Sequence, residues 1–314
     1  MTKNILCIIF VLHGFTFSND SVFKGSGVNV TPEFSSDVQM VHETIEITER
    51  AGPYWDVFVD ATFKNYGDAL DLQIGFPFRV YNGGGDIINY PSTPDSFKVF
   101  VNDKEYPFKL KNGTLNKQFP DIKYAVVYTF NVHFEPGESK RIKHTYSLAE
   151  SFNSVGSKSF EYILQTGSLW KGDIEKIDIK LKIRKKRVPE FQIISPKESN
   201  CYVENNYVIL EWNFTDINPE FNLSISSLPD MYKNKTLDWM IEAQYDVFNH
   251  GDFNGVARYF RNLVFAHYGY PFKNPFFEIH FYDSRSFSKN ENYSFENISS
   301  KHKDFIDEML DITK

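Results

Sequence analysis

Residues 56–64 read Asp-Val-Phe-Val-Asp-Ala-Thr-Phe-Lys, with an apolar side chain at every second position from Val57 to Phe63. Successive side chains of a β-strand point to opposite faces of its sheet, so this alternation predicts a strand with one buried and one solvated face. One-sided strands are typical of antiparallel sheets, whereas the strands of parallel sheets are buried on both faces. The same period of two recurs in residues 70–76, 124–134, 177–183 and 208–214. We therefore expect an antiparallel β-sandwich over residues 19–187.

Turn residues separate the alternating segments, because glycine, asparagine and aspartate tolerate the backbone conformations that tight turns need. The expected turns are Gly67-Asp68, Asn102-Asp103, Asn112-Gly113 and Pro136-Gly137-Glu138. Pro77 is expected to end the strand of residues 70–76, since proline has no N–H for the sheet. Further strands are expected in residues 188–228, where they either extend the sandwich or form a small second β domain.

Residues 229–314 change to a helical period, which makes the predicted fold class α+β. Apolar residues recur at helical spacing in residues 237–248 and again from Val256 to Val264. Gly269 follows the second segment and is expected to close it in the left-handed conformation. Pro275 is expected to begin a second short helix, and Ser299 or Ser300 a last one.

Residues 257–282 carry a resemblance to a known family. They read Ala-Arg-Tyr-Phe-Arg-Asn-Leu-Val-Phe-Ala-His-Tyr-Gly-Tyr-Pro-Phe-Lys-Asn-Pro-Phe-Phe-Glu-Ile-His-Phe-Tyr and resemble the YARHG domain, a small module of bacterial extracellular proteins. The positions that match are Arg258, Arg261, Asn262, Ala266, Gly269, Tyr270 and Phe272. Phe265 replaces the first Tyr of the family motif, and His267-Tyr268 replaces its Arg-His. The resemblance implies a helical extracellular module, which we expect over residues 229–314, and it implies no reaction.

The same stretch supplies the candidate binding residues of the helical module. Polar or aromatic side chains at Arg258, Arg261, Asn262, His267 and Tyr268 are candidates for contact with a ligand. The alternative is that Arg261, Asn262 and His267 only hold the turn by hydrogen-bonding loop carbonyls, since buried polar groups in small domains usually serve structure. Gly269, Tyr270 and Phe272 are expected to be structural.

A second resemblance covers the β region. The runs Asn65-Tyr66-Gly67, Gly75-Phe76-Pro77 and Thr166-Gly167-Ser168-Leu169-Trp170-Lys171-Gly172 resemble the β-sandwich of DUF4424-like envelope proteins, a family without an established activity. Trp170 lies between two glycines and is interpreted either as a core residue or as an exposed platform for a ligand. The glycine-rich loop of residues 83–90, with Asp86, is the other binding candidate, because loops on rigid sandwiches often carry sites.

The N-terminus predicts export. Lys3 precedes an apolar run over residues 5–17, and the small residues Thr16 and Ser18 resemble a cleavage site. We expect a signal peptide over residues 1–18, with an uncleaved anchor as the alternative, and no transmembrane span after its removal. The expected location is therefore secreted, periplasmic or on the cell envelope of a bacterium.

Composition limits the partners. Only Cys201 remains in the exported chain, and we expect an inert buried thiol there. The formal net charge of −7 argues against nucleic acid as a partner. The basic run of residues 184–187 is interpreted as a solvated linker, with contact to an anionic polymer or lipid as the alternative. An aromatic content of 17% suits a packed core, and an aromatic surface for sugars or peptides is the other interpretation.

The sequence contains no linear motif of a known catalytic, metal or nucleotide site, so we predict no catalytic residue, metal or cofactor. Our first hypothesis is a non-enzymatic, exported bacterial envelope protein whose sandwich binds cell-wall glycan or another envelope protein. The alternative is an extracellular hydrolase whose active site is dispersed over loops and leaves no motif.

Overall fold

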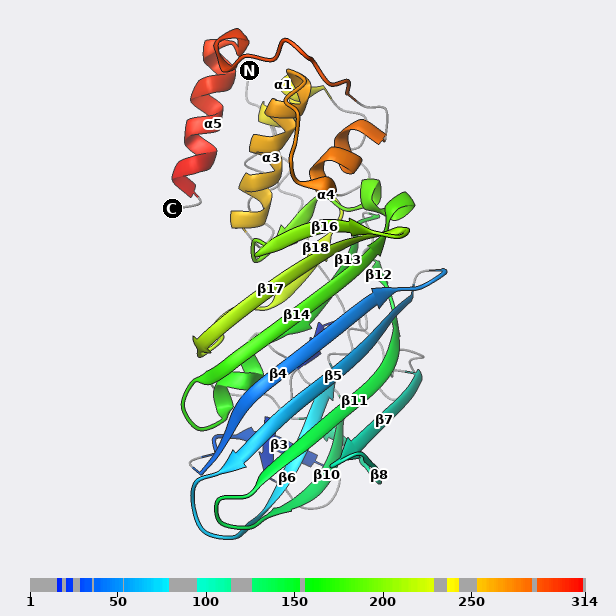
Figure 1. Cartoon of the computed structure of the whole chain (residues 1–314), viewed down its shortest axis with the longest axis vertical. Coiled ribbons are helices and arrows are strands. Elements are labelled where there is room, and N and C mark those ends of the chain that lie inside the picture. The colour runs from blue at the N-terminus through cyan, green and yellow to red at the C-terminus, as the bar shows by residue number, and fades with distance from the viewer. Residues whose placement is uncertain are drawn as a thin grey trace, which may run out of the picture.

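The computed structural model describes residues 16–18, 21–24, 29–35, 37–52, 54–78, 95–113, 126–152, 156–228, 236–242, 253–283 and 287–312. The fold class is α+β, as the sequence predicts: two β-sheets are followed along the chain by a group of helices that stands at one end of them (Figure 1). Within the described residues, no helix is long and apolar enough to cross a membrane.

The sheet at the front of Figure 1 has, in the part of the chain that the structure describes, eight strands in the order β16-β17-β14-β4-β5-β11-β7-β8. Its strands are β4 (Val38–Glu49), β5 (Tyr54–Asn65), β7 (Asp95–Val101), β8 (Lys104–Tyr106), β11 (Ser139–Ala149), β14 (Ile174–Arg184), β16 (Asn200–Glu204) and β17 (Tyr207–Ile217). Neighbouring strands are antiparallel except β4 and β14, which are parallel. The sheet is therefore mixed, although most of its pairs follow the predicted antiparallel pattern.

Within the described residues, the back sheet has ten strands, of which nine follow the order β10-β9-β3-β2-β6-β1-β13-β18-β15, and β12 pairs with β13. Its strands are β1 (Thr16–Ser18), β2 (Ser21–Lys24), β3 (Asn29–Glu33), β6 (Leu70–Phe78), β9 (Lys109–Gly113), β10 (Val126–Phe134), β12 (Ser151–Phe152), β13 (Lys158–Ile163), β15 (Ile193–Ser195) and β18 (Leu223–Ser226). The pairs β1–β13 and β3–β9 are parallel. Strands from residues 188–228 join both sheets, because β16 and β17 extend the front sheet while β15 and β18 extend the back sheet.

The core lies between the inward faces of the strands. In β5 the predicted alternation is confirmed, since Val57, Val59, Ala61 and Phe63 are buried and the residues between them are half-buried. Trp55, at the start of the same face, packs its ring against Phe160 of β13 at 5.0 Å and thereby joins the two sheets. The period of two therefore places the apolar face of β5 correctly.

Two sequence predictions about strand ends are wrong. Pro77 lies inside β6, opposite Val127 of β10, and the strand continues to Phe78. The pairing with β10 on both sides of Pro77 carries the strand past it. Asn112-Gly113 forms the end of β9 rather than a turn, because Asn112 pairs with Val126. The turn at Asn102-Asp103 is confirmed, since both residues have positive φ between β7 and β8.

The helices follow the predicted order. They are α1 (Leu237–Glu242), α3 (Phe253–His267), α4 (Pro275–Glu278), which continues as the π-helical turn η5 (Ile279–Asp283), and α5 (Ser300–Ile312). The 3-10 turns are η2 (Gln165–Leu169), η3 (Lys185–Glu190) and η6 (Phe295–Asn297). Ser299 caps α5, because its Oγ accepts a hydrogen bond from the backbone N of His302. The helix predicted over 237–248 is present as α1, and residues 243–248 lie outside the described part of the chain.

The helices and the sheets share one continuous set of buried apolar side chains, which includes Trp212 of β17 and Phe260 of α3. The helical group also contacts the sheets through defined elements, with α3 against β15 and α4 against β16. Burial of apolar surface is the main favourable term in folding, so this shared core fixes the helices to one end of the sandwich.

Candidate functional site

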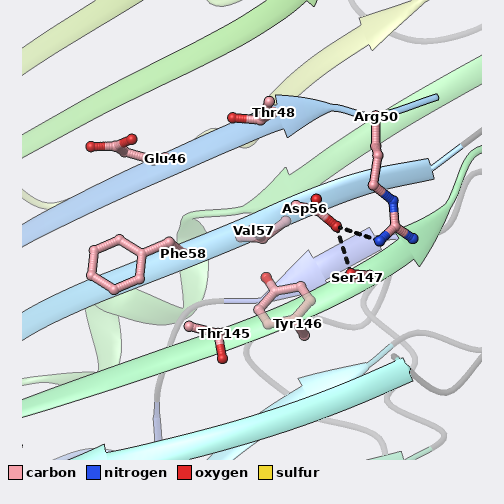
Figure 2. Close-up of a pocket in the computed structure, with 9 residues that line it drawn as sticks. All are labelled: Glu46, Thr48, Arg50, Asp56, Val57, Phe58, Thr145, Tyr146 and Ser147. Carbon is pink, nitrogen blue, oxygen red and sulfur yellow. Dashed lines mark hydrogen bonds and ion pairs between the residues drawn. The ribbon is translucent and has the colours of Figure 1, made fainter.

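A shallow hollow of about 360 Å³ lies on the outer face of the front sheet (Figure 2). It spans β4, β5 and β11 and is lined by Glu46, Thr48, Arg50, Asp56, Val57, Phe58, Thr145, Tyr146 and Ser147. Val57 and Tyr146 are buried and belong to its floor, while the other residues are half-buried or exposed. The hollow therefore combines polar walls with one aromatic ring on the solvent side of a sheet.

The strand register builds this lining from two adjacent cross-strand rows. Thr48, Asp56 and Ser147 lie opposite one another in the first row. Glu46, Phe58 and Thr145 lie opposite one another in the second row. Directly opposed residues on one face have their Cβ atoms about 5 Å apart, so each row brings its three side chains together.

Hydrogen bonds and charges organise the first row. The Oγ atom of Ser147 donates to Oδ1 of Asp56 at 2.6 Å, and Nη1 of Arg50 lies 3.6 Å from the same oxygen. Exposed ion pairs of this kind contribute only about 0–1 kcal/mol, so a ligand can replace them at little free-energy cost. Asp56 is thus held in place and is still able to change partner.

The second row contains Phe58, an aromatic residue on the solvent side of the sheet. Phe58 occupies a solvent-side position of β5, where the alternating pattern also places Tyr54 at the start of the strand and otherwise Asp56, Asp60, Thr62 and Lys64. In the same row, Oε2 of Glu46 accepts a hydrogen bond from Nζ of Lys182 at 3.2 Å. A flat ring beside carboxylates and hydroxyls offers both an apolar face and directional hydrogen bonds, which is the chemistry that recognises a pyranose sugar.

Among the described residues, no group of three His, Cys, Asp or Glu side chains could hold a metal ion. The hollow itself offers two carboxylates, from Glu46 and Asp56, and no histidine or cysteine. The arrangement is therefore suited to binding through hydrogen bonds and ring contact.

Arg258, a predicted binding residue, lies instead in an internal ion pair. Its Nη1 and Nη2 atoms donate to the two carboxylate oxygens of Glu198 at 2.5 Å each. Asn274, the cap of α4, donates to the same carboxylate at 2.6 Å, and the Arg258 guanidinium lies 4.8 Å from the centre of the Phe277 ring. The Glu198 side chain is only 3% exposed. Arg258 therefore fixes the helices to the segment between β15 and β16, and Glu198 is the partner that the sequence did not reveal.

Tyr268 belongs to a chain of hydrogen bonds between helices. Its Oη atom lies 2.9 Å from Nδ1 of His302 and accepts a hydrogen bond from the backbone N of Ser299 at 3.1 Å. On its other side, Nε2 of His302 lies 3.4 Å from Oδ1 of Asp238, whose pKa is lowered by the hydrogen bond from Lys301 and then by the one from His302. The network joins the end of α3 to α1 and α5, which is a structural role.

The other polar candidates of α3 do not converge on one ligand site. His267 is exposed, and partial burial followed by the charge of His302 lowers its pKa. Burial lowers the pKa of Arg261, and the neighbouring Arg258 lowers it further. Asn262 is 8% exposed and lies on the buried side of the helix.

The three residues predicted to be structural form a helix-ending motif. Gly269 has a φ of +82°, as predicted for a left-handed cap. Its N–H donates to the carbonyl of Ala266 at 3.0 Å, and the N–H of Tyr270 donates to the carbonyl of Phe265 at 3.0 Å. This pair of bonds is the Schellman motif, and the 5.5 Å contact between the rings of Phe265 and Tyr270 supplies its apolar contact. Phe272 is buried and stacks on Phe281 at 5.4 Å.

Trp170, Asp86 and Cys201 are the other residues that the sequence singles out. Trp170 is 1% exposed and packs on Phe63 at 4.6 Å, so it is a core residue and the exposed-platform interpretation is wrong. Asp86 and the rest of the loop 83–90 lie outside the described residues. Burial raises the pKa of Cys201 to about 12, which agrees with an inert thiol.

The basic run 184–187 is not a solvated linker. Arg184 ends β14 and donates its Nε to Glu49 at 2.6 Å, while Arg187 in η3 donates its Nη2 to Glu150 at 2.7 Å. Both carboxylates are buried, and burial raises the pKa of Glu150. Sequence alone does not reveal these partners because they lie more than thirty residues away along the chain.

Comparisons with known proteins show a shared fold. No family model and no curated protein matches the sequence. A crystal structure from Legionella pneumophila, described as a "putative nutrient binding protein", matches with a TM-score of 0.55 and 20% identity over 96% of this chain and 98% of that one. An M1 zinc metallopeptidase from Deinococcus radiodurans matches with a TM-score of 0.37 and 10% identity over 62% of this chain and 43% of that one. The first likeness shows that both chains share a fold over nearly their whole length, and the second is too weak to carry an argument.

Proposed function

We propose that this chain is an exported bacterial envelope protein that binds an envelope glycan through the hollow of β4, β5 and β11. The observation that carries the proposal is the half-buried ring of Phe58, which stands on the solvent side of the sheet between Glu46 and Thr145. The description of the Legionella protein as a binding protein agrees with a binding role. The YARHG resemblance and the apolar N-terminus support export.

The chemistry of the hollow favours an uncharged sugar. A pyranose places C–H groups on one face and hydroxyl groups around its edge. Phe58 would contact the C–H face, and the carboxylates of Glu46 and Asp56 would accept hydrogen bonds from the hydroxyls. Hydrogen bonds to charged acceptors contribute about 1.5–3 kcal/mol each, so two of them with one ring contact are enough for binding in the micromolar to millimolar range.

The test is isothermal titration calorimetry with the tetramer of β-1,4-linked N-acetylglucosamine, which represents the sugar backbone of a cell wall. We expect the Phe58→Thr variant to weaken binding at least about tenfold, because it removes the ring while keeping a residue that favours strands. Phe100→Thr is the matched control, since Phe100 is another half-buried aromatic side chain in the same sheet and does not line the hollow. Equal affinities of the wild type and the Phe58→Thr variant would refute this site.

A second experiment addresses the envelope partner and the location. Isolated cell-wall sacculi should retain the wild-type protein and lose most of the Phe58→Thr variant, while an unrelated acidic secreted protein sets the background. Intact-mass measurement of protein from the envelope or medium should give a chain that begins near Asn19 and therefore lacks β1, which Thr16–Ser18 form in the full-length structure. A full-length product found only in the cytoplasm would exclude export.

A further inference from the structure

Two of the three runs that resemble the DUF4424-like region, residues 65–67 and 166–172, meet at the end of β5 opposite to the hairpin of β4 and β5 (Figure 1). The backbone N of Tyr66 donates to the carbonyl of Asp37 at 2.9 Å, and the backbone N of Lys171 donates to the carbonyl of Val38 at 3.0 Å. Residues 65–67 and 166–172, about a hundred residues apart in sequence, thus flank the start of β4 together.

A buried asparagine holds this turn in one conformation. Asn65 is fully buried, and its side chain accepts a hydrogen bond from the N–H of Gly67 at 2.9 Å. Its Nδ2 atom donates to the carbonyls of Asp68 at 2.7 Å and Glu135 at 3.1 Å. A buried amide with its hydrogen bonds satisfied is rigid, because any movement leaves a polar group unpaired. The turn therefore fixes the residue next to Asn65, which is Tyr66.

Tyr66 points outward from this rigid turn and is 47% exposed. Two ammonium groups converge on its ring: Nζ of Lys64 lies 4.8 Å from the ring centre and Nζ of Lys171 lies 5.8 Å from it. Neither lysine forms an ion pair with a carboxylate in the described part of the chain, although the protein carries a net charge of −7. Asp37, which lies nearby, packs its side chain against Gly67.

Three lysines of β14 differ from these two. Lys176, Lys180 and Lys182 each lie within 3.2 Å of a carboxylate oxygen on the outer face of the sheet. Each ammonium group is attracted to the electron-rich face of the Tyr66 ring, but the two positive charges repel each other, and an anion placed between them offsets that repulsion with two attractions. The exposed part of the Tyr66 side chain supplies in addition an apolar contact for the same ligand.

We propose that Tyr66, Lys64 and Lys171 form a second binding site, which takes a sugar that carries an anionic group. The sugar packs against the exposed part of the Tyr66 side chain, and the anionic group bonds to the two lysines. This site shares no residue with the hollow, so either site can fail its test while the other stands.

The test is titration of the full chain with trigalacturonic acid, whose sugar rings each carry a carboxylate. We expect the double variant Lys64→Gln/Lys171→Gln to weaken binding about a hundredfold, or about tenfold for each charge-assisted hydrogen bond. Lys289→Gln is the matched control, because Lys289 also lies over a tyrosine ring, Tyr282 at 5.9 Å, but is paired with Glu278 at 2.5 Å. The control should bind as the wild type does.

Three further ligands test whether the site recognises a charged sugar, an anion alone or a lipid headgroup. The methyl ester of trigalacturonic acid should bind weakly, since it keeps the sugar rings and loses the charges, and equal binding would overturn the proposal. Inorganic phosphate should bind much more weakly than the sugar acid, and equal binding would overturn the role of Tyr66. Vesicles containing phosphatidylglycerol should not compete with the sugar acid. Retention on such vesicles without binding of the sugar acid would assign the lysines to a lipid headgroup instead.

Discussion

Gly269 is the residue at which a single added carbon should do the most harm to the helical part. Its φ of +82° lies in the left-handed region, which residues with a Cβ rarely adopt. A Cβ placed on Gly269 would lie 2.5 Å from Cβ of Asn290 and 2.6 Å from the backbone N of Asn290. That same backbone N donates to the carbonyl of Gly269 at 2.9 Å. Gly269→Ala therefore both strains the backbone and pushes away a hydrogen-bonded neighbour.

The two effects have separate magnitudes. The left-handed conformation costs a residue with a Cβ about 1–2 kcal/mol. Relief of the clash requires Asn290 to move, which loses its backbone hydrogen bond to Gly269 at about 1 kcal/mol. We expect Gly269→Ala to lower the free energy of unfolding by about 2–3 kcal/mol, which is a large part of the 5–15 kcal/mol typical of a folded protein.

Gly137→Ala isolates the first effect, because Gly137 has a similar φ of +73° and nothing lies within 4 Å of its would-be Cβ. Urea unfolding of both variants should show a loss for Gly269→Ala that exceeds the loss for Gly137→Ala by about 1 kcal/mol. Limited proteolysis should locate the added sensitivity in residues 253–312. Equal losses in the two variants, or new cleavage confined to the β-strands, would refute the reasoning.

Three other experiments test the environments of Glu198, His280 and Cys201. Glu198→Gln should lower the free energy of unfolding in urea by about 3 kcal/mol, because it leaves the charge of Arg258 poorly compensated. The double variant Glu198→Leu/Arg258→Met should recover part of that loss. A Glu198→Gln variant as stable as the wild type would contradict the role of this ion pair in fixing the helices to the sheets. His280, which is buried against the carbonyl of Val188, has a pKa lowered by burial from 6.5 to about 4. The unfolded state therefore binds more protons between these pH values, and stability should fall by about 1.4 kcal/mol per unit as pH drops through that window. His280→Gln should show a flatter pH dependence, and an unchanged slope would refute the assignment. With its pKa raised to about 12, the partly buried Cys201 thiol should react with a disulfide reagent at pH 8 roughly fifty times more slowly than in urea, because the smaller thiolate fraction is partly offset by the greater nucleophilicity of a more basic thiolate. An equally fast reaction in the folded state would contradict the raised pKa.

Local patterns predicted the elements of this fold well. The alternation in residues 56–64 predicted β5 and its buried face because side-chain direction in a strand depends only on the backbone. Gly269 was predicted as a left-handed cap, and Ser299 as one of two possible starts of the last helix, for the same reason: helix ends expose backbone groups that neighbouring residues must satisfy. Such features need no knowledge of distant contacts.

Distant contacts explain what the sequence did not predict. The parallel pairing of β4 with β14 joins residues more than a hundred positions apart, and no turn signal connects them. Arg258 was interpreted as a binding residue because an arginine in a motif carries no mark of its partner, and Glu198 lies 60 residues away. The basic run 184–187 was wrongly interpreted as a solvated linker for the same reason, since its partners Glu49 and Glu150 lie in distant parts of the sequence.

The hollow also depends on register, because its two rows exist only once β4, β5 and β11 are aligned. One sequence signal was present in Phe58, an aromatic residue in the polar half of an alternating strand, and it points to the hollow more directly than the aromatic content of the chain does.

Salt concentration distinguishes the two proposed sites from each other. The proposed ligand of the hollow is uncharged, so its binding should change little between low and high salt. At the turn, Lys64 and Lys171 attract an anion across solvent, and the screening length falls from about 10 Å at 0.1 M salt to about 3 Å at 1 M. Binding of trigalacturonic acid should therefore weaken strongly over this range, while binding of the N-acetylglucosamine tetramer should persist. If both ligands lost affinity equally, one charged surface would explain both signals, and the assignment of the hollow to an uncharged sugar would be wrong.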